Sequence, residues 1–237
     1  MELLAIAVQK GMNLQTNTPV LEISESADTE GYWTLTTPRG TTKAKQVLFA
    51  TNGYTSGVLP QYRDKIISMR GVVGRVVVTA PLAPTAGKIL GSCSPKWEPL
   101  LHDYYGVRPD ESLIIGGAWR KLRGHPDEYV NVFDDSTLIP STDGYFEGWA
   151  EETFRGWEDA GTKVEHVWTG IMGDTVDELP HIGLVPSKPG QFICAGFNGH
   201  GMPNVLLCAK GIAKVMKDDR DYQWTHQDLQ EKRQHQN

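Results

Sequence analysis

The 237-residue sequence has no long hydrophobic run. Its apolar stretches, such as residues 76–80 and 205–209, are far shorter than the roughly 20 residues needed to cross a bilayer. No basic segment stands ahead of the apolar residues near the N-terminus, as it would in a secretory signal. We therefore expect no membrane-spanning helix, no membrane partner and a cytoplasmic location.

An excess of basic residues is also lacking. The sequence has 23 Lys and Arg residues against 29 Asp and Glu residues, which gives a formal net charge of -6. A surface that follows a phosphate backbone needs clustered positive charge, so nucleic acid is not an expected partner. The proportions of hydrophobic residues, 39%, and of charged residues, 22%, are instead typical of a folded globular chain.

Cysteine pairs and metal-ligand spacings are missing as well. The three cysteines, Cys93, Cys194 and Cys208, lie far apart and form no Cys-x-x-Cys pair, so we expect buried thiols and no zinc or redox site. The histidines are not spaced as metal ligands, and no metal is expected. The sequence also lacks a Gly-x-Ser-x-Gly elbow, the motif that would indicate a Ser-His-Asp hydrolase.

The first part of the chain carries the pattern of a helix followed by a strand meander. Apolar residues recur at near-helical spacing over residues 3–10, and Gly11 suits a helix C-cap. Three short strands are predicted after it, at residues 20–23, 32–36 and 46–50. A turn is predicted at residues 38–40.

The middle of the chain predicts a second antiparallel sheet. Residues 66–80 are rich in Val and contain two glycines, as in a long bent strand. Residues 104–107 and 112–116 flank Pro109-Asp110-Glu111, a natural hairpin connection. An amphipathic helix is then predicted over residues 141–157, and a strand over residues 164–171.

The sharpest local feature is the glycine-rich segment at residues 192–203. A strand over residues 191–195 leads into Gly196, Gly199 and Gly201 and then into a helix, so free N–H groups and the helix dipole favour negative charge there. As a dinucleotide fingerprint the segment is incomplete, because Asn204 stands where a third glycine is required. A tight connection without a ligand is the alternative.

The helix after this loop is predicted to have an apolar face. Its members are Val205, Ala209, Ile212 and Met216. Beyond Lys217 the sequence is almost wholly polar and predicts a frayed or disordered tail.

A second motif lies at residues 168–183. Its core, Asp-x-x-Pro-x-Ile-Gly, is formed by Asp177, Pro180, Ile182 and Gly183. The alternative interpretation is an ordinary turn in which Asp174 and Asp177 cap local N–H groups.

Together with residues 47–53, these two motifs make the chain resemble the C-terminal half of a known family. That family is the FAD-dependent oxidoreductases of the D-amino-acid oxidase/glycine oxidase/sarcosine oxidase superfamily, and the resemblance covers residues 3–217. It implies an α+β fold in which an antiparallel substrate-type sheet with flanking helices packs on a truncated, Rossmann-like FAD-binding portion. It also implies four sections: a residual nucleotide-domain segment (1–60), the substrate-type sheet (61–165), a flavin-side segment and helix (166–217) and a polar tail (218–237).

The resemblance implies FAD as cofactor. The residues that it places at the flavin are Thr51, Gly170, Gly196, Asn198, Gly199, His200 and Gly201. The helix after the loop would stabilise negative charge on the reduced ring. Family members begin with a Gly-x-Gly-x-x-Gly unit that binds the pyrophosphate, and this chain has none, so we do not expect it to bind FAD tightly by itself.

The substrate expectation depends on one departure from the family. Amino-acid oxidases of this superfamily often carry an Arg just after the glycine of the second motif, and this chain has Met172. Arg70 or Arg120 could supply a carboxylate clamp, but an amine or a related apolar small molecule fits better. The candidate catalytic or pocket-wall residues are His200, Arg70, Tyr105 and Met172.

Three functions remain open from the sequence. The first is a truncated FAD-dependent oxidoreductase that transfers hydride from an amine to flavin, with the missing N-terminal half supplied elsewhere. The second is a flavin-free descendant that catalyses a cyclisation, isomerisation or elimination. The third is a non-catalytic partner of a full-length relative, for which a homo-oligomer or an exposed apolar interface is expected.

Overall fold

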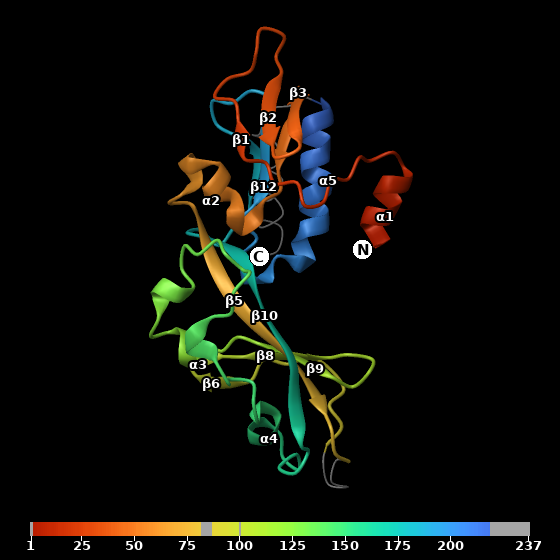
Figure 1. Ribbon diagram of the computed structural model, residues 1–237, viewed down its shortest axis with the longest axis vertical. Helices are drawn as coiled ribbons and strands as arrows, with labels where there is room; N and C mark the ends of the chain where they lie inside the picture. Colours follow the sequence, from red (N-terminus) through yellow and green to blue (C-terminus); the bar gives the residue numbers. More distant parts are fainter. Residues whose placement is uncertain (1, 82–86, 100, 219–237) are drawn as a thin grey trace, which may run out of the picture. The chain divides into compact units, whose positions relative to one another are not determined.

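The computed structural model describes residues 2–81, 87–99 and 101–218 and divides into two compact units, each discontinuous in sequence (Figure 1). The first unit comprises Met1–Phe49, Ile182–Ile193 and Lys210–Asn237, and the second comprises Ala50–His181 and Cys194–Ala209. The four expected sections stay a prediction. Apart from Asp218, the predicted polar tail lies outside the described residues.

The first unit contains the predicted meander. Strands β1 (Glu22–Ile23), β2 (Trp33–Thr37) and β3 (Gly40–Ala44) form an antiparallel sheet in that order. The turn between β2 and β3 uses Gly40 at φ +124°, a conformation that favours glycine. The predicted turn at residues 38–40 is therefore confirmed.

A second sheet of the first unit has the order β11-β12-β4, with β11 at His181–Leu184, β12 at Gln191–Ala195 and β4 at Val47–Phe49. Strand β12 runs parallel to β4. The indole of Trp33 donates a hydrogen bond to the Pro189 carbonyl at 3.0 Å, which ties the meander to the segment before β12. The strand predicted at residues 191–195 is confirmed.

Two helices complete this part of the chain. Helix α1 (Glu2–Gln9) ends before Gly11 at φ +95°, as a glycine C-cap requires, but none of its residues is buried. Helix α5 (Met202–Asp218) buries Ile212 and Val215. The predicted face is thus only partly covered, since Val205 stays 36% exposed.

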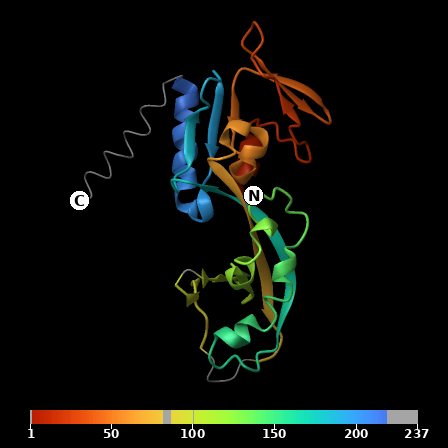
Figure 2. The same cartoon turned by 90° about the vertical axis from the view of Figure 1, so that its left-hand side faces the viewer.

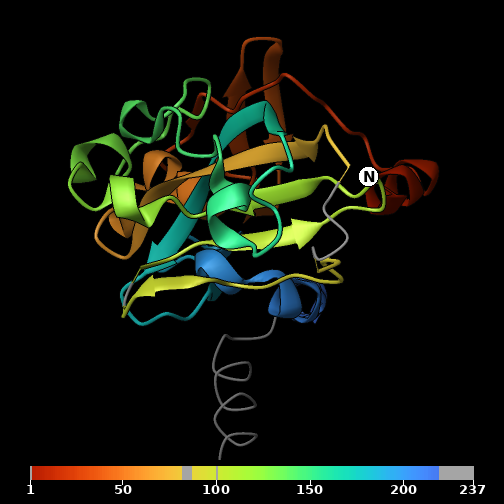
Figure 3. The same cartoon turned by 90° about the horizontal axis from the view of Figure 1, so that it is seen from below.

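The second unit is built on an antiparallel sheet with the order β10-β5-β9-β8. Its long strands, β5 (Ile66–Val78) and β10 (Thr162–Thr175), run alongside one another over their whole length (Figure 2). Strands β8 (Tyr104–Val107) and β9 (Leu113–Gly116) form the predicted hairpin (Figure 3). Strands β6 (Lys96–Glu98) and β7 (Leu101–His102) form a small separate ribbon.

The two faces of this sheet differ in burial. Side chains alternate along β5, and one face, which we call the closed face, buries Ile66, Ser68, Arg70, Val72 and Val76. The opposite face, which we call the open face, carries half-buried residues of β5 at Ile67, Met69, Gly71 and Val73. By register, the open face continues on β10 at Trp168, Gly170, Met172 and Asp174.

Short helices and irregular segments pack against the closed face. They include α3 (Trp119–Leu122), η3 (Pro126–Glu128), η4 (Pro140–Thr142) and α4 (Trp149–Thr153). The helix predicted over residues 141–157 is wrong, because Gly144, Gly148 and Gly156 adopt positive φ angles of +64°, +69° and +80° and interrupt it. Only the single turn of α4 remains, with Trp149 in the core.

A buried carboxylate organises the closed side of the unit. Asp103 is fully buried, and its Oδ2 accepts hydrogen bonds from Trp97 Nε1, Tyr145 Oη and Trp149 Nε1 at 2.9, 2.7 and 2.8 Å. Its Oδ1 accepts the Ala118 N–H at 2.8 Å. Four donors therefore stabilise one charge, which fixes the aromatic side chains around it.

No helix within the described ranges is long and apolar enough to cross a membrane. The coarse expectation of antiparallel sheets combined with helices is confirmed.

Candidate functional site

The glycine loop is fastened to a short turn after β4. This turn, η1 (Asn52–Tyr54), places the Asn52 Oδ1 so that it accepts the N–H groups of Gly196 and Phe197 at 3.1 and 2.9 Å. Asn52 itself has a φ of +42°, a left-handed conformation that asparagine tolerates better than most residues. Thr51 precedes the turn, and its hydroxyl lies 2.8 Å from that of Thr55 in α2 (Thr55–Val58).

A second asparagine fastens the loop to the end of β10. Asn198 begins η5 (Asn198–His200), and its Oδ1 accepts the Thr175 N–H at 2.9 Å. Its Nδ2 donates to the Gly196 carbonyl and to the Thr175 hydroxyl, both at 3.2 Å. The loop is therefore held at the last residue of the longest strand by side-chain hydrogen bonds.

Several glycines around the loop allow close packing of the backbone. A Cβ added to Gly53 would lie 2.2 Å from the Met172 carbonyl oxygen. Cβ atoms at Gly196 and Gly201 would lie 2.6 Å from the Thr175 Cγ2 and 2.4 Å from the Phe197 Cβ. These three positions have no room for a side chain, so their glycines are explained by the local fold.

Gly170 and Gly199 are different because they lie beside free space. A Cβ added to Gly170 would meet no described atom within 4 Å, and one at Gly199 would meet only the Met172 Sδ, at 3.9 Å. Gly170 belongs to the open face, and Gly199 is exposed. The backbone at both glycines can therefore be approached closely by a flat ligand.

Met172 connects the loop to the open face. Its Cε would lie 3.3 Å from a Cβ added to Gly71, and its Sδ faces Gly199, so the thioether lies between β5 and the loop. His200 follows Gly199 and is exposed. The structure thus brings together Gly170, Met172, Gly199 and His200, four of the residues selected from the sequence.

Asp174 lies on the same face as Met172, two residues farther along β10. Its Oδ1 is buried and has no hydrogen-bond partner among the described residues. Burial raises the pKa of the Asp174 carboxyl above its ordinary value, although the nearby His200 acts to lower it. Asp174 does not cap the following turn, whereas Asp177 does, by accepting the Leu179 N–H at 3.2 Å.

Arg70 and Tyr105 point to the other side of the sheet. Arg70 pairs with Ile171 on the closed face, where its Nη2 donates to the Thr137 hydroxyl at 2.9 Å. Tyr105 pairs with Ile115 on the closed face, and its ring centroid lies 5.2 Å from that of Phe154. Neither residue therefore lies on the same face as Met172.

Arg120 is also occupied elsewhere. Its guanidinium carbon lies 4.2 Å from the Trp97 ring centroid, and its Nε donates to the Tyr145 hydroxyl at 3.0 Å. It belongs to the aromatic group around Asp103, so it is not placed to bind a carboxylate beside Met172.

Three residues of the open face were not among the candidate site residues chosen from the sequence. These are Asp174 and Trp168 on β10 and Tyr104 on β8, which pairs with Gly116 so that its ring lies over that glycine. Burial raises the pKa of the Tyr104 hydroxyl. The strict alternation of β8 and β10 was the available signal, but it did not indicate which face was covered.

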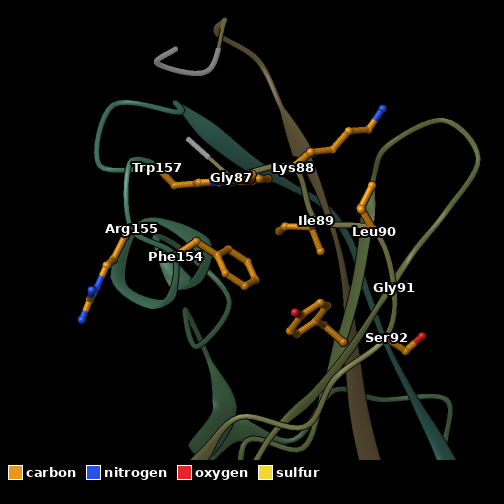
Figure 4. A pocket seen from close by; sticks show the side chains of 10 residues that line it. Gly87, Lys88, Ile89, Leu90, Gly91, Ser92, Phe154, Arg155 and Trp157 are labelled. Atoms are coloured by element: carbon orange, nitrogen blue, oxygen red, sulfur yellow. Dashed lines mark hydrogen bonds between the residues drawn. The ribbon is translucent and has the colours of Figure 1, made fainter. Parts of the chain in front are cut away.

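A separate pocket of about 390 Å³ lies elsewhere in the second unit (Figure 4). Its lining includes Ile89, Phe154 and Trp157, while the side chains of Lys88 and Arg155 point away from it. It shares no residue with the glycine loop or with β10. We therefore keep it apart from the candidate site.

The cysteine expectation is only partly confirmed. Cys93 is exposed, which corrects the prediction of a buried thiol. Cys194 is buried, and burial raises its pKa to about 11, while Cys208 is half-buried. In the ranges that the structure describes, no cluster of three His, Cys, Asp or Glu side chains could hold a metal ion.

The fold is shared with solved oxidoreductases. Glycine oxidase from Geobacillus kaustophilus is 19% identical at a TM-score of 0.64, and the match covers 91% of this chain and 52% of that chain. Glycine oxidase from Bacillus cereus is 14% identical at a TM-score of 0.65, with coverages of 92% and 55%. L-proline dehydrogenase from P. horikoshii is 16% identical at a TM-score of 0.60, with coverages of 92% and 54%.

The chain thus spans only about half the length of these proteins. No curated protein matches it. A family model described as FAD dependent oxidoreductase matches residues 1–215. Because that match covers nearly the whole sequence, the chain belongs to the DAO family of FAD-dependent oxidoreductases.

Proposed function

We propose that this chain forms the flavin-ring side and the substrate side of an FAD-dependent oxidoreductase that oxidises an amine. The single observation that carries the proposal is the free space at Gly170 and Gly199 beside Met172, next to a loop that two asparagines hold in place. Family membership and the likeness to proteins named as glycine oxidase and L-proline dehydrogenase support the reaction class.

The residues present fit an isoalloxazine ring. Gly170 and Gly199 would allow the ring to approach the backbone, and the Met172 thioether would contact it through dispersion. The 17-residue helix α5 begins directly after the loop, and its positive end would favour negative charge on the ring. Bound FAD would supply the hydride acceptor.

The remaining residues proposed from the family resemblance serve the geometry of the loop. Asn198 and Gly196 hold the loop against Thr175, and Gly201 allows the chain to turn tightly into α5. Thr51 stands at the start of the turn that anchors Gly196. His200 is exposed next to Gly199 and would border the ring and the substrate.

The phosphate side of the cofactor needs a further polypeptide segment. The 237 residues contain no Gly-x-Gly-x-x-Gly unit, and the chain spans about half of its structural relatives. In the first unit, α1 exposes Leu3, Leu4 and Ile6, and in the second unit the first turns of α5 expose Leu206 and Leu207. Apolar side chains of this kind are what a nucleotide-binding half would cover.

We assign the first unit to the residual FAD-binding portion and the second unit to the substrate-type sheet. Parallel pairing of β12 with β4 supports the first assignment, because a nucleotide-binding sheet is mostly parallel. The broad antiparallel sheet with one half-exposed face supports the second.

Riboflavin binding tests the proposal directly. Riboflavin is titrated into the purified chain, and quenching of its fluorescence gives the dissociation constant. Gly199→Leu should weaken binding by at least about tenfold, since it would fill the space in front of the ring. Gly124→Leu is the matched control, because an added Cβ at Gly124 would meet no described atom within 4 Å and Gly124 lies outside the loop.

Equal binding by wild type and Gly199→Leu would contradict the assignment of the ring to this loop. Absence of riboflavin binding by the wild-type chain would contradict the proposed function of this chain as the ring side of the site.

A further inference from the structure

We infer that Asp174 is the anionic group of the substrate site and that it binds the ammonium of a cationic amine that has no carboxylate. The inference rests on the proposed function, since it assigns a substrate class to the same open face. It differs from the substrate that the name glycine oxidase states for two of the structural relatives, because glycine carries a carboxylate.

The position of Asp174 is the first argument. It pairs with Ile67 across β5 and shares the open face with Met172 and Met69, which pair with each other. It lies close enough to His200 for the histidine charge to act on its carboxyl. A ligand that lies on Met172 beside the loop would therefore be within reach of this carboxylate.

The unsatisfied oxygen is the second argument. Asp174 Oδ1 is buried, and no described residue donates a hydrogen bond to it. A buried polar atom without a partner costs free energy, and most such atoms in folded proteins have one. Asp103 shows the contrast within the same unit, since four donors of the chain satisfy its two oxygens. The missing donor at Asp174 has the chemistry of an ammonium N–H.

The lack of a free arginine is the third argument. In residues 66–75 and 166–175, which form the neighbouring parts of β5 and β10, the cationic side chains are Arg70, Arg75 and His166. Arg70 is on the closed face. Arg75 is engaged by Asp110 at 2.8 Å and by Glu165 at 2.5 Å. A substrate carboxylate would therefore find no free arginine there and would be repelled by Asp174.

The remaining surface favours an apolar substituent on the amine. Met69 and Met172 are half-buried thioethers that pair with each other on the same face. Thioethers bind alkyl and aryl groups. The substrate class is thus an alkylamine or arylalkylamine that is protonated in solution.

Methyl NMR on the full 237-residue chain tests this inference. The chain is labelled with 13C at the methionine methyl groups, and the Met69 and Met172 signals are assigned with Met69→Leu and Met172→Leu. Benzylamine and benzoate are titrated separately as probes of opposite charge and similar shape. Benzylamine should shift the Met172 and Met69 signals, and benzoate should leave them unchanged.

Two variants locate the charge that is responsible. Asp174→Asn should weaken benzylamine binding by at least about tenfold, the effect expected for loss of a hydrogen bond to a charged group. Asp177→Asn is the matched control, because it removes the same charge from an exposed residue three positions away, and it should change nothing. Thermal unfolding of both variants verifies that they are folded.

Three results would overturn the inference: no shift with benzylamine, equal shifts with benzoate, or an unchanged benzylamine dissociation constant in Asp174→Asn. Riboflavin titration of the same sample separates this inference from the proposed function. Riboflavin binding without benzylamine binding would contradict only the assignment of Asp174. Benzylamine binding without riboflavin binding would contradict only the flavin proposal.

Discussion

The two faces of the sheet β10-β5-β9-β8 differ in how far the rest of the chain buries their side chains and provides hydrogen-bond partners for their carboxylates. On the closed side, apolar residues such as Val72 and Ile115 are almost fully buried, and the Asp103 carboxylate accepts four hydrogen bonds. On the open side, Met69 and Met172 are half-buried and an oxygen of Asp174 has no partner among the described residues. The closed face is part of a packed core, and the open face has the composition of a binding surface.

We therefore expect residues of the closed face to maintain the fold and residues of the open face to bind a ligand. Substitutions of packed or hydrogen-bonded groups on the closed face should lower the free energy of unfolding because these groups have partners to lose. The Arg70 Nε is an exception, since it is buried without a hydrogen-bond partner among the described residues. Substitutions on the open face should leave that free energy nearly unchanged and alter binding. Matched substitutions on the two faces therefore test this difference.

The largest effect is expected for Asp103→Asn. The amide keeps the shape but replaces one acceptor oxygen with a donor. Either the three side-chain donors, Trp97, Tyr145 and Trp149, then lose their acceptor, or the Ala118 N–H does. We expect the free energy of unfolding in urea to fall by about 3 kcal/mol or more. A loss below about 1 kcal/mol would show that the carboxylate is not what holds this side together.

Gly74→Ala and Gly71→Ala compare the faces on one strand. A Cβ at Gly74 would lie 2.7 Å from the Phe146 ring, which is fixed in the core, whereas one at Gly71 would lie 3.3 Å from the mobile end of Met172. Overpacking should lower the free energy of unfolding by about 1–3 kcal/mol in Gly74→Ala and by much less in Gly71→Ala. Thermal melting of the two variants measures the difference, and equal melting temperatures would contradict it.

Tyr145→Phe and Tyr104→Phe test the hydroxyl groups. Tyr145 donates to Asp103 and accepts from Arg120, and burial together with Asp103 raises its pKa to about 12. Loss of the Tyr145 hydroxyl should lower the free energy of unfolding by about 1–2 kcal/mol. Tyr104→Phe on the open face should stay within about 0.5 kcal/mol of wild type in urea unfolding. A larger loss at Tyr104 than at Tyr145 would reverse the proposed roles of the faces.

The smallest effect is expected for Asp174→Asn and has the opposite sign. Because the folded-state pKa of Asp174 is raised above its unfolded value, stability is lost as the pH rises through the folded pKa. The variant lacks this loss, so it should be at least as stable as wild type at neutral pH, and the difference should vanish in acid. His200 is the charged neighbour that acts to lower the pKa of the Asp174 carboxyl. Destabilisation by Asp174→Asn at neutral pH would be inconsistent with an unpartnered charge.

Much of the strand structure could be predicted because short local sequence patterns specify it. The Val-rich run of β5 and the Pro109-Asp110-Glu111 turn between β8 and β9 specify their elements without help from distant residues. The helix expected over residues 141–157 failed because its apolar spacing comes from packing on the sheet. Its three glycines with positive φ could not be foreseen from periodicity.

The site was predicted less completely for a related reason. Alternation along a strand shows that Tyr104 and Tyr105 point to opposite faces, but the covering segments decide which face is buried. Arg70 was selected for its chemistry and proved to be buried on the closed face. Asp174 was interpreted only as a possible turn cap because the expected strand ended at residue 171, whereas β10 continues to Thr175.

In the proposed function, this chain supplies the ring side of a flavin site and not its phosphate side. Riboflavin, FMN and FAD are titrated into the purified chain, with fluorescence quenching as the readout. We expect weak binding with dissociation constants that agree within about threefold, because the shared ring makes the contacts. Binding of FAD at least about a hundredfold tighter than riboflavin, or no binding of any of the three, would contradict this proposal.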